Sequence, residues 1–304
     1  MTEQPLVSVI INCYNSEEFL RETIDSVLAQ TYHNWEIILW DNQSTDATSE
    51  IAKSYNDERI RYFYAPTHTP LGEARNYAMD KAKGDYLTFL DSDDVWLPEF
   101  LERGIEILET DKALVGYYSN RYVIRNSTKI VGNDELDGIR SIEDIITNYR
   151  IDVSACTLRF CVIRDNHVRV NNSYQMIEDF DFFINVASHG NYYYDNRPLM
   201  CCRVHMSETY KKRDRWYFEY CSFRESADKL HNKGVISNNC LKAIDDKIIE
   251  SKLGYLVCEN CRIDYVIHIL RHFCQLHKCW KQMLLFVILG RDRFLKVMNN
   301  RLLS

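Results

Sequence analysis

Apolar residues in the first half of the chain recur in two alternating patterns. Short β-branched and aromatic runs are typical of buried strands, and stripes at helical spacing predict amphipathic helices between them. Asn15 and Glu18 are spaced as a capping box for the first of these helices. The predicted strands are residues 7–11, 36–40, 60–64, 86–90 and 114–118, and the helices are about 16–28, 47–54, 73–82 and 98–110. This alternation predicts an α/β fold with right-handed crossovers and a mostly parallel sheet flanked by helices.

The alternation weakens after about residue 120. Residues 126–138 have the composition of a polar loop, 154–163 have strand character, and 178–188 predict a helix. Helical patterns dominate from residue 208 onward. We therefore predict an α/β domain at 1–207 and a helical C-terminal region at 208–304.

Polar side chains follow three of the predicted strands, at the point where each strand ends. Because open parallel sheets bind ligands beyond the carboxyl ends of their strands, these side chains are expected to share one site. The three clusters are Asn12, Tyr14 and Asn15, then Asp41 and Asn42, then the run Asp91, Ser92, Asp93 and Asp94.

The acidic run at 91–94 is the strongest chemical signal in the sequence. Carboxylates crowded on one turn repel each other unless a cation lies among them, and oxygen ligands of this kind suit Mg²⁺ or Mn²⁺. A solvated acidic turn that caps the next helix would have the same composition. The position beside two other polar clusters at strand ends favours the metal site.

Composition and charge narrow the class of protein. Hydrophobic residues make up 46% and charged residues 27%, as in an ordinary packed globular protein. The formal net charge of −7 argues against a nucleic-acid partner. No window reaches the ~18 consecutive apolar residues of a membrane span, and the first residues lack the features of a secretory signal. The 11 Cys are then expected to be reduced thiols, which indicates a cytoplasmic protein.

Several further segments, in unbroken order over about residues 5–110, identify a family. The set resembles family 2 glycosyltransferases, and the resemblance extends more weakly to about residue 207. The segments are VSVIINCYN at 7–15, QTY at 30–32, DNQSTD at 41–46, GEARN at 72–76, KGDY at 83–86 and FLDSDDVWLP at 89–98. The resemblance implies a GT-A (Rossmann-like) fold, a nucleotide-diphosphate-sugar donor, a divalent metal (Mn²⁺ or Mg²⁺) and transfer with inversion. It also implies that residues 1–207 are the catalytic domain, with a nucleotide-binding half at about 1–110 and an acceptor half at about 111–207.

The resemblance also implies roles for the residues after the first two strands. Asn12 and Tyr14 would line the nucleoside pocket, with Asn15 beside them. Asp41 or Asn42 would contact the base or ribose. The family commonly has a second Asp where this chain has Asn42, and Asn offers both a donor and an acceptor. A UDP-sugar is the favoured donor, and Asn42 leaves the base open.

The remaining implied roles belong to the diphosphate and the metal. Arg75 would lie near the base or diphosphate, and Asp91 and Ser92 would contact the nucleotide sugar. Asp93 would be the main metal ligand, with Asp91 as a second. Some family members place a His near the diphosphate or metal, which makes His205 a candidate ligand. A lone His is as readily a structural or surface residue.

A carboxylate is needed to take the proton of the acceptor hydroxyl. Asp179 is the candidate general base, because the family usually carries Glu-Asp or a similar pair at a helix start in this region. Glu178 and Asp181 are the fallbacks. An acidic first turn that favours the positive end of a helix would give the same pattern.

The leading hypothesis is therefore a metal-dependent inverting glycosyltransferase that builds a bacterial surface polysaccharide or a lipid-linked glycan. The alternative is a nucleotide-sugar-binding protein without catalysis. A dinucleotide-dependent dehydrogenase is disfavoured because the first strand is not followed by Gly-x-Gly-x-x-Gly.

The C-terminal segment 280–304 mixes apolar and basic residues. A helix of this kind lies on an anionic bilayer, near a lipid-linked acceptor, or packs on the catalytic domain or on another subunit of a homo-oligomer. The first possibility would place the protein at the inner face of the cytoplasmic membrane.

Overall fold

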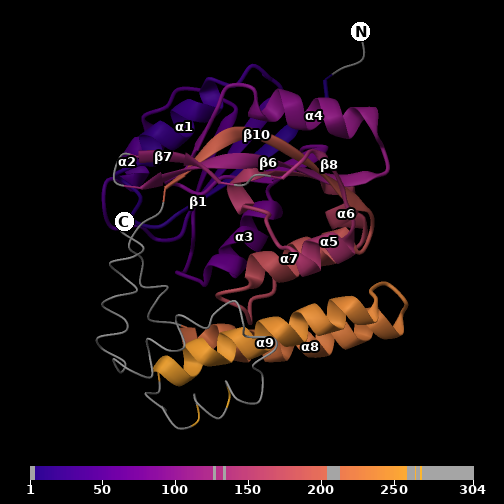
Figure 1. Cartoon of the computed structure of the whole chain (residues 1–304). Coiled ribbons are helices and arrows are strands. Elements are labelled where there is room, and N and C mark those ends of the chain that lie inside the picture. Colours follow the sequence, from indigo (N-terminus) through magenta and orange to yellow (C-terminus); the bar gives the residue numbers. More distant parts are fainter. Residues whose placement is uncertain are drawn as a thin grey trace. The chain divides into compact units, whose positions relative to one another are not determined.

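The computed structural model describes residues 4–125, 128–132, 135–203 and 213–258, together with Asp264 and His268. The chain divides into two compact units, Met1–His205 and Met206–Ser304. The first unit holds a sheet with helices on both faces (Figure 1). The second contains two long helices, α8 (Arg213–Asn232) and α9 (Asn238–Cys258), which pack against each other. The roles predicted for the two regions stay predictions.

Four parallel strands form the first half of the sheet, in the order β3-β2-β1-β4. They are β1 (Val7–Cys13), β2 (Trp35–Asp41), β3 (Ile60–Tyr64) and β4 (Tyr86–Phe89). The connecting helices are α1 (Leu20–Leu28), α2 (Thr48–Lys53) and α3 (Leu71–Met79). The strands β1, β2 and β4 are almost wholly buried because helices cover both of their faces, which explains their continuous apolar sequences.

The second half of the sheet is mixed, in the order β4-β9-β6-β10-β5. Its strands are β5 (Val95–Trp96), β6 (Leu114–Arg125), β9 (Cys156–Arg159) and β10 (Asn191–Arg203). β9 pairs antiparallel with β4 and β6, whereas β10 runs parallel to β6. The parallel arrangement predicted for the sheet therefore holds for its first half and not for its second.

Helices cover this second half from both sides. They are α4 (Phe100–Thr110), α5 (Ile142–Thr147), α6 (Phe160–Asp165) and α7 (Glu178–Ala187). In Figure 1, α1 and α4 lie on one side of the sheet, and α3, α5 and α7 lie on the other. The apolar core on the first side joins α1 and α4 to the inward residues of β1 and β2.

Two predictions for the region after residue 120 are wrong in detail. The polar loop predicted at 126–138 contains an exposed edge strand, β7 (Thr128–Val131), and ends where β8 (Gly138–Arg140) begins. The strand predicted at 154–163 divides into a 3₁₀ turn at Val153–Ala155, the short β9 and the helix α6. A short apolar run has the same pattern in a buried strand and in a buried helix, so periodicity alone does not separate them.

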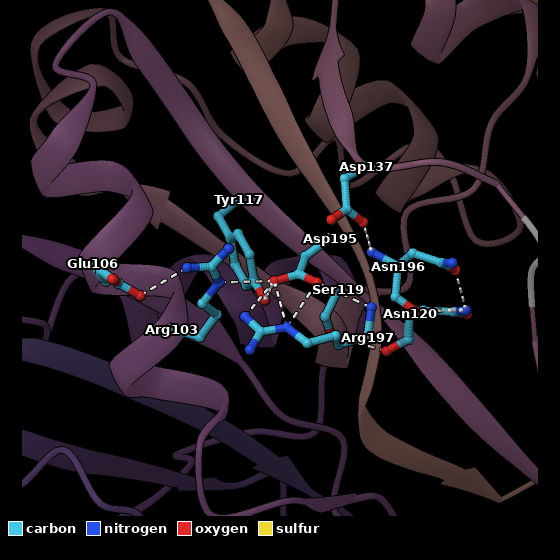
Figure 2. Close-up of polar contacts among 9 residues, drawn as sticks. All are labelled: Arg103, Glu106, Tyr117, Ser119, Asn120, Asp137, Asp195, Asn196 and Arg197. Atoms are coloured by element: carbon cyan, nitrogen blue, oxygen red, sulfur yellow. Dashed lines mark hydrogen bonds and ion pairs between the residues drawn. The ribbon is translucent and has the colours of Figure 1, made fainter.

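A fully buried carboxylate fixes the long strand β10 to its neighbours. Figure 2 shows Arg103 from α4 and Arg197 from β10 directed at Asp195. The Asp195 Oδ2 atom lies 3.0 Å from Arg103 Nε and 2.8 Å from Arg197 Nη2, and Tyr117 OH donates to it at 3.4 Å. Burial alone would raise the pKa of Asp195, and the two guanidinium groups outweigh it and lower the pKa. The ion cluster lies where the pairing of β10 with β6 is irregular, between Asp195 and Pro198, and it stabilises that part of the strand.

Asn120 and Asn196 extend this cluster along β10. The Asn120 amide donates to the carbonyl of Asn196 at 3.2 Å and to its Oδ1 at 3.1 Å, and the Asn196 N–H donates to Asp137 Oδ1 at 2.6 Å (Figure 2). The irregular part of the strand thus has side-chain partners in place of the regular ladder, as buried backbone polar groups require.

No helix within the described part of the chain has the length and apolar character of a membrane-spanning segment.

Replacement of Asp195 tests the ion cluster. Asp195→Ala leaves two guanidinium groups without their shared partner, and we expect the free energy of unfolding to fall by about 2–3 kcal/mol, because both arginines are partly exposed and water replaces part of the loss. Urea denaturation measures this change. The control Glu106→Gln removes only an exposed partner of Arg103 and should change stability by less than ~0.5 kcal/mol. Equal effects of the two variants would contradict the assignment.

Candidate active site

The loops after β1, β2 and β4 meet at one edge of the sheet, as the sequence predicts. The hydroxyls of Ser16 and Ser92 lie 2.8 Å apart, which joins the loop after β1 to the loop after β4. Asn15 joins the loops after β1 and β2, because its N–H donates to Ser44 Oγ at 3.0 Å and its Oδ1 accepts from Thr45 N at 2.9 Å. The three loops therefore form one continuous surface.

The predicted capping role of Asn15 is wrong. The helix α1 begins at Leu20, and its N-cap residue, Phe19, makes no side-chain capping hydrogen bond. Asn15 has a positive φ of 50°, a left-handed conformation that Asn tolerates better than most residues. Its side chain accepts hydrogen bonds from Thr45 instead, so contact with the neighbouring loop outweighs the local helix signal.

Aromatic side chains cover one end of this surface. Tyr14 is 53% exposed, and its ring centroid lies 4.4 Å from that of His68, whose Nδ1 is 2.8 Å from the carbonyl oxygen of Asn42. Near the end of β1, the buried Nδ2 atom of Asn12 has no hydrogen-bond partner among the residues that the structure describes. An unpaired buried amide donor is costly, so a ligand with an acceptor in its reach recovers free energy there. The exposed rings and the free amide donor suit a flat heterocycle.

Asp41 and Asn42 lie beneath this surface and hold its loops. The carboxylate of Asp41 is fully buried; it accepts from Ser44 N at 2.8 Å and from Tyr62 OH at 2.7 Å. Burial and this carboxylate raise the pKa of Tyr62 to about 12. The amide of Asn42 donates to the carbonyl of Thr69 at 2.7 Å and accepts from its N–H at 3.1 Å. Both side chains shape the loops, and their contact with a base or ribose stays a prediction.

Arg75 connects the two halves of the site. The residue is 4% exposed, and its guanidinium group lies 3.2 Å from Asp91 Oδ1 on one side and 3.6 Å from Glu178 Oε1 on the other. Burial disfavours the charged form, but the carboxylates of Asp91, Glu178 and Asp179 outweigh it and raise the pKa of Arg75. The residue therefore stays cationic and ties the turn after β4 to the first turn of α7.

The acidic turn after β4 brings three carboxylates, those of Asp91, Asp93 and Asp94, into a short stretch of chain. The carboxylate of Asp91 is 44% exposed, whereas Asp94 is buried and accepts from the backbone N–H of Arg203 at 3.0 Å. The guanidinium group of Arg203 donates to the carbonyl oxygen of Asp93. Burial is the main cause that raises the pKa of Asp94 well above the usual range, and the carboxylates of Asp152 and Asp91 add to the rise. A cation at this turn would relieve the repulsion.

The donor set at this turn fits a divalent metal that binds together with a phosphate. Among the described residues, no three His, Cys, Asp or Glu side chains converge as a complete metal site. Mg²⁺ and Mn²⁺ bind through one or two carboxylates and fill their remaining positions with water and substrate oxygens. Asp91 and Asp93 supply such oxygens. His205, the third predicted ligand, lies outside the described residues.

Asp179 lies in the first turn of α7, next to Glu178, and its carboxylate acts on the charge of Arg75. Its Oδ1 accepts from the N–H of Phe180 at 2.7 Å and its Oδ2 accepts from Tyr149 OH at 3.0 Å. Burial raises the pKa of Asp179 in spite of these hydrogen bonds. A carboxylate with a raised pKa and a fixed orientation is suited to accept a proton.

The fallback residues are less suited to this role. The carboxylate of Glu178 pairs with Arg75. Asp181 is buried and lies two residues beyond Asp179, which is about 200° round the helix and therefore on its other side. Burial raises the pKa of Asp181 to about 6.

The sequence analysis did not single out four residues that the structure brings to the site. Tyr149, Asp152 and Ser154 come from the segment between α5 and β9, and Arg203 comes from the end of β10. The only local signal was the acidic and hydroxyl character of this segment. Its partners Asp179 and Asp91 lie 30 and 63 residues away in sequence.

Comparison with known proteins gives consistent matches. The sequence pattern of glycosyl transferase family 2 matches residues 8–169. An uncharacterised glycosyltransferase of Rickettsia typhi is 32% identical over 68% of this chain and 67% of its own length. The Escherichia coli protein named UDP-Glc:alpha-D-GlcNAc-diphosphoundecaprenol beta-1,3-glucosyltransferase WfaP is 34% identical over 61% of this chain and 71% of its own.

The fold also resembles that of solved structures. The crystal structure of Staphylococcus aureus TarS in complex with UDP-GlcNAc aligns with a TM-score of 0.66 over 82% of this chain and 72% of TarS. The sequence identity of 19% limits this likeness to the fold.

The buried carboxylate of Asp181 predicts a pH-dependent stability difference. Its folded pKa of about 6 exceeds its ordinary value of 3.8, so its ionisation opposes folding. The penalty is absent below pH 3.8, grows up to about pH 6 and is constant above. We expect Asp181→Asn to raise the free energy of unfolding by ~2 kcal/mol at pH 7.5.

Urea denaturation at pH 4.5 and at pH 7.5 tests this expectation, and the gain should shrink at the lower pH. The control Asp165→Asn alters an exposed carboxylate and should give no such trend. A gain from Asp181→Asn that is the same at both pH values would contradict the assignment.

Proposed function

The chain belongs to glycosyl transferase family 2 and has the GT-A type of fold, and from that premise we propose that it is a metal-dependent, inverting enzyme. It moves a sugar from a nucleoside-diphosphate donor to an acceptor hydroxyl. The observation that carries the proposal is the position of Arg75, which links the acidic turn after β4 to the helix that bears Asp179.

The donor occupies the edge of the sheet where the three loops meet. Tyr14 and His68 offer an aromatic surface to the base, and the Asn12 amide offers a hydrogen bond. Asp93 and Asp91 would hold the divalent metal, Mn²⁺ or Mg²⁺, and His205 is the third predicted ligand. When bound, the metal stabilises the negative charge that develops on the departing diphosphate.

Asp179 acts on the acceptor from the other side of the transferred sugar. It accepts the proton of the attacking hydroxyl while that oxygen bonds to the anomeric carbon and the bond to the diphosphate breaks. Attack on the face opposite the leaving group inverts the anomeric centre. Tyr149 donates a hydrogen bond to one carboxylate oxygen of Asp179, which orients the base. Arg75 fixes the position of α7 relative to the turn after β4.

A uracil-containing donor and a lipid-linked or polysaccharide acceptor have the best support. The Escherichia coli relative is named for a UDP-Glc donor and a diphosphoundecaprenol-linked acceptor, and the TarS structures hold UDP-GlcNAc or UDP. An acceptor of this kind would explain a peripheral membrane contact at the cytoplasmic face through residues 280–304. That segment lies outside the described residues, and both this contact and a homo-oligomer stay predictions.

Replacement of Asp93 tests the metal site. Asp93→Ala removes the main ligand, and we expect turnover to fall by at least ~100-fold, because the charge of the leaving group loses its main stabilisation. Steady-state rates with a panel of nucleotide sugars, and Mn²⁺ binding followed by electron paramagnetic resonance, measure the effect. The control Asp80→Ala alters an exposed carboxylate that pairs with Arg169 and should keep both properties. Wild-type turnover and Mn²⁺ binding in Asp93→Ala would refute the metal assignment.

Replacement of Asp179 tests the general base. Asp179→Asn keeps the size of the side chain but cannot take a proton, so turnover should fall by ~10²–10⁴-fold with donor affinity near that of the wild type. Calorimetric titration of donor and a coupled assay for released nucleoside diphosphate separate the two quantities. Tyr149→Phe, which keeps the carboxylate and removes one hydrogen bond, should lose less. If Asp179→Asn retained most of its turnover, another base would be required.

A further inference from the structure

One short segment, residues 149–154, contacts both halves of the site. At its start, the hydroxyl of Tyr149 donates to Asp179 Oδ2 at 3.0 Å. At its end, the hydroxyl oxygen of Ser154 accepts from the backbone N–H of Asp91 at 3.1 Å. Ser154 is itself fully buried, and its carbonyl oxygen accepts from Trp96 Nε1 at 2.6 Å, so this end of the segment is fixed. The segment therefore spans the space between the candidate base and the acidic turn.

Asp152 lies in this segment, between its two contacts. Its Oδ1 accepts from the N–H of Ser154 at 3.1 Å, and its Oδ2 lies 3.3 Å from Arg121 Nε of β6. The side chains of Asp152 and Arg121 are 15% and 27% exposed, so both retain some accessible surface. Burial raises the pKa of Asp152, Arg121 opposes the rise, and the charges of Asp91 and Asp179 add to it. Asp152 is thus near both functional carboxylates.

The proposed reaction places the transferred sugar between the acidic turn and Asp179. This placement rests on the proposed function, in which the diphosphate lies at Asp91 and Asp93 and the acceptor hydroxyl lies at Asp179. The transferred sugar must then lie between these points, beside Asp152. A carboxylate accepts hydrogen bonds from sugar hydroxyls, and a guanidinium group donates to them. The Asp152–Arg121 pair therefore offers one acceptor and one donor to two neighbouring hydroxyls.

We propose that Asp152, paired with Arg121, reads the configuration of the hydroxyls on the transferred sugar and so determines which donor the enzyme prefers. The carboxylate is held by Ser154 and Arg121, so it presents a fixed acceptor direction. A site that is built to hydrogen-bond a hydroxyl discriminates strongly against a substrate that directs the hydroxyl elsewhere, because its buried polar groups are left unpaired. Asp152 acts on specificity, whereas proton transfer belongs to Asp179.

The test compares donors that differ at one hydroxyl. The ratio of kcat/KM is measured for UDP-glucose against UDP-galactose and for UDP-GlcNAc against UDP-GalNAc, in the wild type, Asp152→Asn and Asp152→Ala. For the donor pair that the wild type turns over more efficiently, we expect the kcat/KM ratio to fall by about tenfold or more in Asp152→Ala. The fall should be smaller in Asp152→Asn, which keeps one acceptor oxygen. The Kd for UDP with Mn²⁺ should change less than the preference, because the proposed function places the diphosphate at Asp91 and Asp93.

Two further measurements separate the explanations. The control Asp165→Asn changes an exposed carboxylate and should preserve the preference, and thermal unfolding verifies that each variant is folded. Unchanged preference ratios in both Asp152 variants, or an equal loss for all donors, would overturn this inference and leave the proposed function intact. A wild-type protein that neither binds nor turns over any nucleotide sugar would overturn the proposed function and this inference with it.

Discussion

A buried guanidinium group is stable only where carboxylates surround it, and the site depends on one such group. Arg75 is almost fully buried and has Asp91 on one side and Glu178 on the other. Because an unpaired charge at this depth costs several kcal/mol, the end of β4 and the start of α7 must stay close to it. This electrostatic requirement joins two parts of the chain that are about 90 residues apart and brings the donor-side turn and Asp179 into one site.

Two other acidic groups near the site also have fixed polar partners. Asp152 faces Arg121, and the backbone N–H of Arg203 binds Asp94 while its guanidinium group binds the neighbouring carbonyl. These partners are fixed by the sheet before any substrate arrives. A site whose dipoles and charges are already oriented spends little free energy on rearrangement when charge moves during a reaction.

The parts of the fold that follow from short-range patterns were predictable from the sequence. The strands β1, β2 and β4 are short apolar runs, and each is followed by a polar loop, so their local sequence predicts them. The acidic turn after β4 is likewise evident from the sequence alone. The long pairing of β6 with β10 and the contacts of Tyr149 and Asp152 arise only when distant segments meet, and no local pattern encodes them. The burial of Asp41, the last residue of β2, likewise depends on the segments that pack around it and is not encoded locally.

The irregular pairing around Asp195 limits how the length of this chain can change. On β10, three residues without partners on β6 lie between the paired positions Asp195 and Met200, and regular pairing resumes there up to Arg203. Side chains alternate between the two faces of a strand, so one inserted or deleted residue would turn every later side chain to the opposite face. Arg203 would then leave the acidic turn. Divergent copies of this protein should therefore vary in length near the exposed strand β7 and keep the spacing from Asp195 to Arg203 constant.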